Sequence, residues 1–207
     1  LLHGLGGSSS REGLRRMGVA LQAAGFAVLR LNLRGADPGR HLAGGTYAAR
    51  CNSDLLPVIA RARMLAAGRP LLGAGISLGG TMLLNAALAS PGVLDGVFCA
   101  SSPLDLAACS ASIERPRNRV YQNWLLKRLV RQTLADPFGV SHDEEVKLQA
   151  PPPRSIRDFD SAVTAPRWGF ADVEAYYREA SPLQHLVPAC KAMPPTLLLQ
   201  ALDDPWA

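Results

Sequence analysis

The sequence predicts an α/β protein built on a mostly parallel sheet with helices on both faces. Strand-like apolar runs alternate with helical patterns over the first half of the chain, as they do in β-α-β units. The runs at 70–76 and 94–100 are almost continuously apolar, which is typical of parallel strands that are buried on both faces. A further apolar run at 194–201 returns to this pattern near the end of the chain.

The elements are expected in a simple order along the chain. Leu1 and Leu2 have the character of a strand end, and a helical pattern follows at 13–24 with Gly25 as its C-terminal cap. Strands are then expected at 26–33, 70–76 and 94–100. A loop is expected at 34–45, and helices are expected at 53–67 and 78–89. Ser53 is the expected N-cap of the helix at 53–67, and Pro57 is tolerated in or near its first turn.

The character of the chain changes after residue 104. Long helical patterns rich in arginine follow, then three consecutive prolines at 151–153, then a mixed aromatic segment. We therefore expect one domain over 1–207, in which 1–104 form the core, 105–189 form an inserted helical lid and 190–207 return to the core. The chain begins without methionine and stops soon after an apolar run, so we expect a piece of a longer protein, truncated at both ends. Any signal or anchor would then lie upstream of Leu1.

Charge and composition argue against several functional classes. The formal net charge is +5, and only three of the 22 basic residues are lysines. The arginines are scattered without interleaved aromatic residues, so we expect no nucleic-acid partner. No apolar stretch reaches the ~20 residues of a membrane span. The four cysteines form no CxxC pair and no metal-ligand spacing with histidine, which predicts free thiols, no metal site and a cytoplasmic location. Peripheral membrane association and the oligomeric state stay open.

The stretch Gly75-Ile76-Ser77-Leu78-Gly79 is a G-x-S-x-G motif between a predicted strand and a predicted helix. In that context the motif predicts a nucleophile elbow, a sharp turn that exposes the serine hydroxyl in strained backbone geometry. The flanking glycines are needed because side chains there would collide with the neighbouring strand and helix. The N–H of Leu78, at the helix N-terminus, is then a candidate donor to an oxyanion.

A second glycine-rich turn, His3-Gly4-Leu5-Gly6-Gly7, follows the strand end at Leu2. It stands where the second oxyanion donor is expected, and the N–H of Leu5 is the candidate. Gly6 and Gly7 allow a close approach of the backbone. His3 is expected to order this loop by hydrogen bonding and not to act as a general base.

Candidate acids follow two of the expected strands. Asp204, directly before Pro205, is the first choice and Asp203 the alternate, because an acid after a late strand would hold a histidine in its working tautomer. Asp105 is a further alternate, although a helix cap explains it better. His41, His142 and His185 all precede Asp204 in the chain, so the catalytic histidine is expected beyond Ala207.

The order of these motifs resembles the YheT-like (AB hydrolase-4) group of α/β hydrolases, over essentially the whole chain. The residues that carry the resemblance are His3-Gly4-Leu5-Gly6-Gly7-Ser8-Ser9, Leu33-Arg34-Gly35, Gly75 to Gly80, Ser102 to Leu106, Arg119-Val120-Tyr121, Phe159 to Pro166, Gly169 to Asp172, Tyr176-Tyr177 and Asp203-Asp204-Pro205. The resemblance implies an α/β-hydrolase fold and a carboxylesterase or acylglycerol lipase-like activity on short- to medium-chain acyl esters. It carries over Ser77 as nucleophile and Asp204 as acid, and it implies no cofactor.

Two other functions remain open at this stage. A non-catalytic hydrolase-fold protein would use the same pocket to bind a ligand, and the absence of a catalytic histidine within the chain favours that alternative. The same triad also serves thioester, amide and acyl-transfer chemistry, among which the fold does not choose. The intact motif and acid favour an enzyme over the non-catalytic protein.

Overall fold

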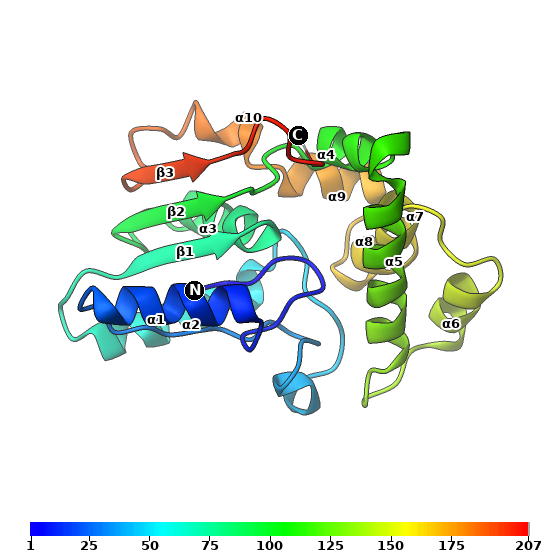
Figure 1. The fold of residues 1–207 in the computed structure, drawn as a ribbon, viewed down its shortest axis with the longest axis horizontal. Helices are drawn as coiled ribbons and strands as arrows, with labels where there is room; N and C mark the ends of the chain where they lie inside the picture. The colour runs from blue at the N-terminus through cyan, green and yellow to red at the C-terminus, as the bar shows by residue number, and fades with distance from the viewer. Residues whose placement is uncertain (207) are drawn as a thin grey trace.

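The computed structural model describes residues 1–206, and Ala207 lies outside the described residues. Three parallel strands form the sheet in the order β1-β2-β3: β1 (Leu72–Ile76), β2 (Gly96–Ala100) and β3 (Thr196–Leu199). Leu72 pairs with Gly96, and Val97 pairs with Thr196. All three strands point towards the same helical segment, so their carboxyl ends form one edge of the sheet (Figure 1). The predicted parallel α/β fold is confirmed.

The strand predicted at 26–33 is not formed as such. Leu2 makes a single parallel bridge to Gly75 on the free side of β1, and the segment 26–33 runs beside residues 1–2 with Leu31 N–H donating to Leu1 O (3.0 Å). A ladder needs several successive partners, and residues 1–2 supply too few. Phe26 and Leu29 are accordingly exposed.

Three helices accompany the strands. The first, α1 (Glu12–Ala23), ends in a Schellman motif in which Gly25 has φ 88° and Phe26 N–H donates to Leu21 O. The second, α2 (Asn52–Ala66), begins after Cys51, so the predicted cap at Ser53 is wrong by two residues. Pro57 lies inside α2, beyond its first turn. The third, α3 (Leu78–Ala89), has the predicted bounds and is buried from Leu78 to Ala87.

The segment between Asp105 and Thr196 consists of helices joined by turns and loops, and it contains no strand. Its α-helices are α4 (Leu106–Ile113), α5 (Arg119–Leu134), α6 (His142–Gln149), α7 (Ile156–Phe159), α8 (Ala165–Arg167), α9 (Val173–Ala180) and α10 (Leu183–Leu186). A π-helical turn, η3 (Asp160–Thr164), joins α7 to α8. The short 3₁₀ helix η2 (Pro116–Asn118) lies between α4 and α5. Another short 3₁₀ helix, η1 (Gly39–Leu42), lies earlier in the chain, between α1 and α2. None of the helices within residues 1–206 is long and apolar enough to cross a bilayer.

The buried apolar residues form two clusters. The larger surrounds α3 and the sheet, and reaches Tyr176 and Tyr177 on α9. The smaller lies within the helical segment, among α4, α5, α6 and α7, with Leu125 and Phe159 as members. Leu5 packs against both clusters. The loop that follows Leu2 therefore lies where the sheet and the helical segment meet.

Candidate active site

Ser77 occupies the turn between β1 and α3. Its backbone has φ 53° and ψ −131°, a left-handed φ that L-residues other than glycine rarely adopt. The turn is fixed by two backbone hydrogen bonds: Ser77 N–H donates to Ala100 O (2.8 Å), and Gly80 N–H donates to Ser77 O (2.9 Å). Strain of this kind persists only where the surrounding structure holds it, and it is frequent at functional sites. Ser77 is half-buried and lines a pocket.

The glycines around Ser77 are required by close approach of the backbone. A Cβ on Gly75 would overlap the backbone of Gly79 and Gly80. A Cβ on Gly79 would lie 2.6 Å from His3 O, and one on Gly4 would lie 2.8 Å from the Ser77 Cβ. The turn at Ser77 and the loop 3–7 therefore pack directly against each other, and glycine in each of them is what allows this close contact.

Two amides of the loop 3–7, those of Gly6 and Gly7, have hydrogen-bond acceptors that fix the path of the loop. Gly6 N–H donates to the Tyr47 hydroxyl (2.7 Å), Gly7 N–H donates to Gly4 O (3.0 Å), and the Tyr47 hydroxyl donates to Gly4 O (3.1 Å). The N–H groups of Leu5 and Leu78, by contrast, donate to none of the residues 1–206. Both leucines line the pocket with Ser77. Two unpartnered amides beside a hydroxyl form a potential oxyanion site.

His3 is engaged at both ring nitrogens. Its Nδ1 donates to Gly4 O (2.9 Å), and its Nε2 accepts from Leu33 N–H (3.3 Å). The ring is buried against the edge of Tyr47, and this burial lowers the pKa of His3. His3 thus orders the loop. The other histidines, His41, His142 and His185, are exposed, and no histidine of the described chain lines the pocket.

The three candidate acids differ in their surroundings. Asp204 is buried after β3, and its Oδ1 accepts from Trp206 N–H (2.9 Å). Asp203 is exposed. Asp105 caps α4 by accepting from Ala108 N–H (3.0 Å). The turn that carries Asp204 is held against the helical segment, because Asn118 Nδ2 donates to Pro205 O (3.1 Å). Trp206, two residues after Asp204, lines the same pocket as Ser77.

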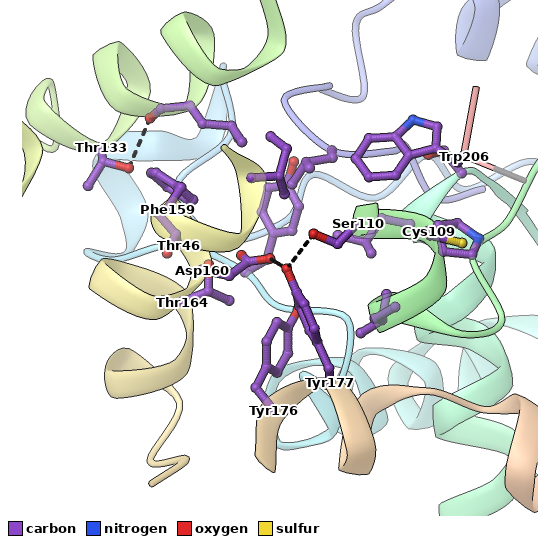
Figure 2. A pocket seen from close by; sticks show the side chains of 18 of the residues that line it. Thr46, Cys109, Ser110, Thr133, Phe159, Asp160, Thr164, Tyr176, Tyr177 and Trp206 are labelled. Carbon is purple, nitrogen blue, oxygen red and sulfur yellow. Dashed lines mark hydrogen bonds between the residues drawn. The ribbon is translucent and has the colours of Figure 1, made fainter. Parts of the chain in front are cut away.

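The pocket lies between the sheet edge and the helical segment (Figure 2). Its lining is mostly apolar: Leu5, Leu78, Leu106, Leu129, Ile156, Phe159 and Trp206, together with Tyr47, Tyr176 and Tyr177. Asp160 is the one carboxylate among the described lining residues. The pocket therefore combines the Ser77 hydroxyl and one carboxylate with a largely apolar lining.

Asp160 lies in the π-helical turn and faces Tyr177 and Ser110 (Figure 2). The Tyr177 hydroxyl lies 2.9 Å from Asp160 Oδ2, to which it donates, and 3.3 Å from Ser110 Oγ. Burial raises the pKa of Asp160 to about 6, although Thr164 and Tyr177 stabilise the carboxylate by hydrogen bonding. Burial likewise raises the pKa of the Cys109 thiol, which also lines the pocket, to about 11.

Comparisons with known proteins assign the chain to a family. The sequence profile of the alpha/beta hydrolase family matches residues 1–207. The chain belongs to the alpha/beta hydrolase family. This membership confirms the predicted fold.

Individual relatives of this alpha/beta hydrolase carry esterase or phospholipase names. It is 31% identical to the Mus musculus protein named phospholipase ABHD3, over 99% of this chain and 49% of the relative. It is 30% identical to the putative esterase YheT of Escherichia coli, over 100% of this chain and 61% of the relative. It is 27% identical to the Saccharomyces cerevisiae protein named medium-chain fatty acid ethyl ester synthase/esterase 2, over 99% of this chain and 50% of the relative. The YheT-like resemblance is confirmed, and the chain spans roughly half the length of these relatives.

Asp160 is an ionisable pocket residue of this hydrolase that motif reasoning did not single out. It lies in the stretch Phe159 to Pro166, where the sequence resembles the lid of the YheT-like group, but no spacing rule marks the aspartate itself. The π-helical turn around Asp160 is a feature often found at functional sites, and it becomes visible only in the structure.

Proposed function

We propose that this chain carries the nucleophile, oxyanion site and acid of a serine hydrolase that cleaves carboxylic esters. The Ser77 Oγ attacks the ester carbonyl carbon, its proton passes to a histidine, and the carbonyl oxygen becomes an oxyanion held by the Leu5 and Leu78 amides. Collapse of this intermediate expels the alcohol and leaves an acyl group on Ser77. Water then releases the acid and restores the serine.

The observation that carries the proposal is the geometry of Ser77. At φ 53°, between a strand and a helix, a glycine would avoid the strain that a serine carries, so the backbone alone does not explain the serine. Ser77 also lines one pocket with Leu5 and Leu78, whose amides have no acceptor among residues 1–206. An exposed hydroxyl on a strained turn is the arrangement that a nucleophile requires.

The base and the acid act as a pair in this proposal. The histidine comes from outside these 207 residues, since His3 is engaged at both ring nitrogens and the other three histidines are exposed. Asp204 is the acid that orients it, because it is buried after β3 at the same sheet edge as Ser77. The exposure of Asp203 and the capping role of Asp105 disfavour both as acids.

The substrate class follows from the pocket lining. Leucine, isoleucine and phenylalanine side chains around Ser77 suit the acyl chain of a short- to medium-chain ester, because burying each methylene contributes about 0.8 kcal/mol. The esterase and phospholipase names of the relatives support an ester substrate.

The test is Ser77→Ala in the full-length protein, assayed with p-nitrophenyl esters and a fluorophosphonate probe. Loss of the nucleophile should lower kcat on the order of 10⁴- to 10⁶-fold and abolish labelling. Ser101→Ala is the matched control: Ser101 also has a left-handed backbone, with φ 50°, at the carboxyl end of the neighbouring strand β2. This control should retain labelling and activity.

Two results would overturn the proposal. Unchanged ester hydrolysis and labelling in Ser77→Ala would refute the nucleophile and favour a ligand-binding protein. Labelling of Ser77 without ester hydrolysis, but with turnover of thioesters or amides, would move the reaction to another acyl substrate.

A further inference from the structure

The outer face of α5 gathers basic and apolar side chains that the sequence shows only as scattered. Val120, Tyr121 and Trp124 are exposed to 84%, 41% and 56%, so three large apolar side chains meet water on one helix. Lys127 and Arg131 are exposed beside them. At 100° per residue these five residues fall within an arc of about 120° on the helix. We call this stripe the α5 outer face.

The charges on this face have one sign. The helix α5 contains four basic residues and no aspartate or glutamate. Arg115 and Arg117, just before it, are also exposed. Burial lowers the pKa of Arg128, and the charge of nearby Arg11 adds to this effect. Three carboxylates lie close to α5 in space or in sequence: Asp37, which pairs with Arg40 (3.6 Å), Glu114 at the end of α4, and Asp136, which follows α5 and accepts from Gly45 N–H (2.6 Å). The balance around the α5 outer face remains strongly positive.

The aromatic residues make this face more than a basic patch. Tyr121 and Trp124 stack with ring centroids 6.1 Å apart, and the Arg128 guanidinium lies 5.9 Å from the Trp124 ring centre. Tryptophan and tyrosine prefer the boundary between lipid headgroups and acyl chains, where basic residues meet the phosphates. The phosphates of a nucleic acid would pair with the basic side chains, but they would leave the side chain of Val120 exposed to water.

We propose that the α5 outer face binds an anionic phospholipid surface, with Val120, Tyr121 and Trp124 inserted at the headgroup level and Lys127 and Arg131 paired with lipid phosphates. The positive charge and the exposed apolar side chains on one stripe are complementary to such a surface, and a zwitterionic bilayer would satisfy only the apolar part.

Docking in this way would bring the pocket to the membrane. The opposite side of α5 lines the pocket through Leu129, Gln132 and Thr133. Arg128 Nε donates to Gly6 O (2.5 Å), which ties the helix to the loop that carries Leu5. Delivery of a lipid ester from the bilayer to Ser77 rests on the proposed function, whereas the binding itself does not.

The test measures vesicle binding by the full-length protein in a Ser77→Ala background, so that the lipids stay intact and no readout depends on catalysis. Sedimentation with phosphatidylcholine vesicles, with and without phosphatidylglycerol, gives the partition coefficient. Lys127→Gln with Arg131→Gln should weaken binding to the anionic vesicles by about fivefold for each charge removed, and should hardly change binding to the neutral ones.

A second pair of variants tests the apolar contact. Val120→Ser with Trp124→Ser should weaken binding to both kinds of vesicle and should remove the quenching of tryptophan fluorescence by brominated lipid acyl chains. The matched control is Arg61→Gln with Met64→Ser, one exposed basic and one exposed apolar residue on α2, which lies towards the other end of the molecule (Figure 1). This control should bind as the parent does.

Three outcomes would overturn the proposal. Equal weakening by the α2 control would mean that no special face exists. Unchanged binding in both α5 variants would place the lipid contact elsewhere. Tight binding to a DNA duplex, lost with Lys127 and Arg131 but without any lipid quenching, would identify a phosphate-backbone partner instead.

Discussion

The two walls of the pocket are built in different ways. The sheet wall, which carries Leu5, Ser77 and Leu78, is defined by the backbone: a left-handed φ, free amides and glycines in close contact. The helical wall, which carries Asp160 and Tyr177, is defined by side chains that hydrogen-bond to one another inside a buried cluster. The sheet wall therefore presents fixed backbone groups, whereas the helical wall presents ionisable side chains.

This difference predicts how each wall responds to mutation. Changes on the sheet wall should either remove a reacting group or prevent the turn from forming, so their effects should be large and independent of pH. Changes on the helical wall should alter protonation and side-chain packing, so their effects should be smaller and should vary with pH. The following experiments, performed on the full-length protein, test this contrast.

Beyond the loss of the nucleophile itself, the largest effect is expected for Asp204→Asn, at the edge where the two walls meet. An amide in place of the carboxylate would hold the histidine in the wrong tautomer and lower kcat on the order of 10⁴-fold, with KM little changed. Steady-state kinetics with a p-nitrophenyl ester measure this. Asp203→Asn is the matched control, because Asp203 is exposed and adjacent. An equal loss in both variants would disprove the assignment of the acid.

Gly75→Ala should destabilise the sheet wall by more than about 4 kcal/mol or prevent folding, because the new Cβ would overlap the backbone of Gly79 and Gly80. Urea unfolding measures the change. Gly13→Ala is the control, since Gly13 lies in α1 with open space around it and should gain up to about 1 kcal/mol. A stable, active Gly75→Ala variant would show that the turn adapts.

On the helical wall, Asp160→Asn should change how stability depends on pH. Burial raises the pKa of Asp160 from 3.8 to about 6, so the folded chain binds this proton more tightly than the unfolded chain does. In the wild type, the protonated carboxyl therefore adds about 3 kcal/mol to the free energy of unfolding below pH 4, and this stabilisation is lost as the pH rises to about 6. The asparagine variant does not titrate, so its free energy of unfolding does not fall in this way.

Chemical denaturation of both proteins from pH 3.5 to pH 7.5 measures that difference. The free energy of unfolding of Asp160→Asn relative to wild type should rise by about 3 kcal/mol across the window and stay level above pH 7. Asp203→Asn, at an exposed site, serves as the reference for a substitution outside the buried cluster. A difference that does not vary with pH would mean that the pKa of Asp160 is the same in the folded and unfolded chains.

The smallest effect is expected for Asp105→Ala, which removes the cap of α4 and should cost about 1 kcal/mol of stability without lowering kcat. Thermal unfolding and an ester assay measure the two quantities. Asp105→Asn preserves a capping oxygen and should behave as wild type. A loss of activity near that of Asp204→Asn would instead identify Asp105 as the acid.

Much of the sheet wall could be predicted from the sequence, because local rules govern it. The apolar runs predicted β1, β2 and β3, the glycine spacing predicted the strained turn at Ser77, and the bounds of α3 were correct to the residue. The prediction of a strand at 26–33 was wrong. This segment lies beside residues 1–2, which are themselves joined to the sheet by a single bridge and are too short to support a ladder. The predicted N-cap at Ser53 was also wrong: the helix begins after Cys51, and residue preferences do not fix the first residue of a helix to within two positions.

The side-chain contacts of the helical wall could not be predicted from these local rules. The sequence by itself determined a parallel α/β core with a serine on a glycine-flanked turn, because strand burial and steric exclusion at glycine act over a few neighbouring residues. Only the tertiary structure decided that Asp160 faces Tyr177, that Asp204 is buried while Asp203 is exposed, and that the cations and aromatic residues of α5 share one face. These features depend on which distant segments pack together, and on the pKa shift that burial then produces.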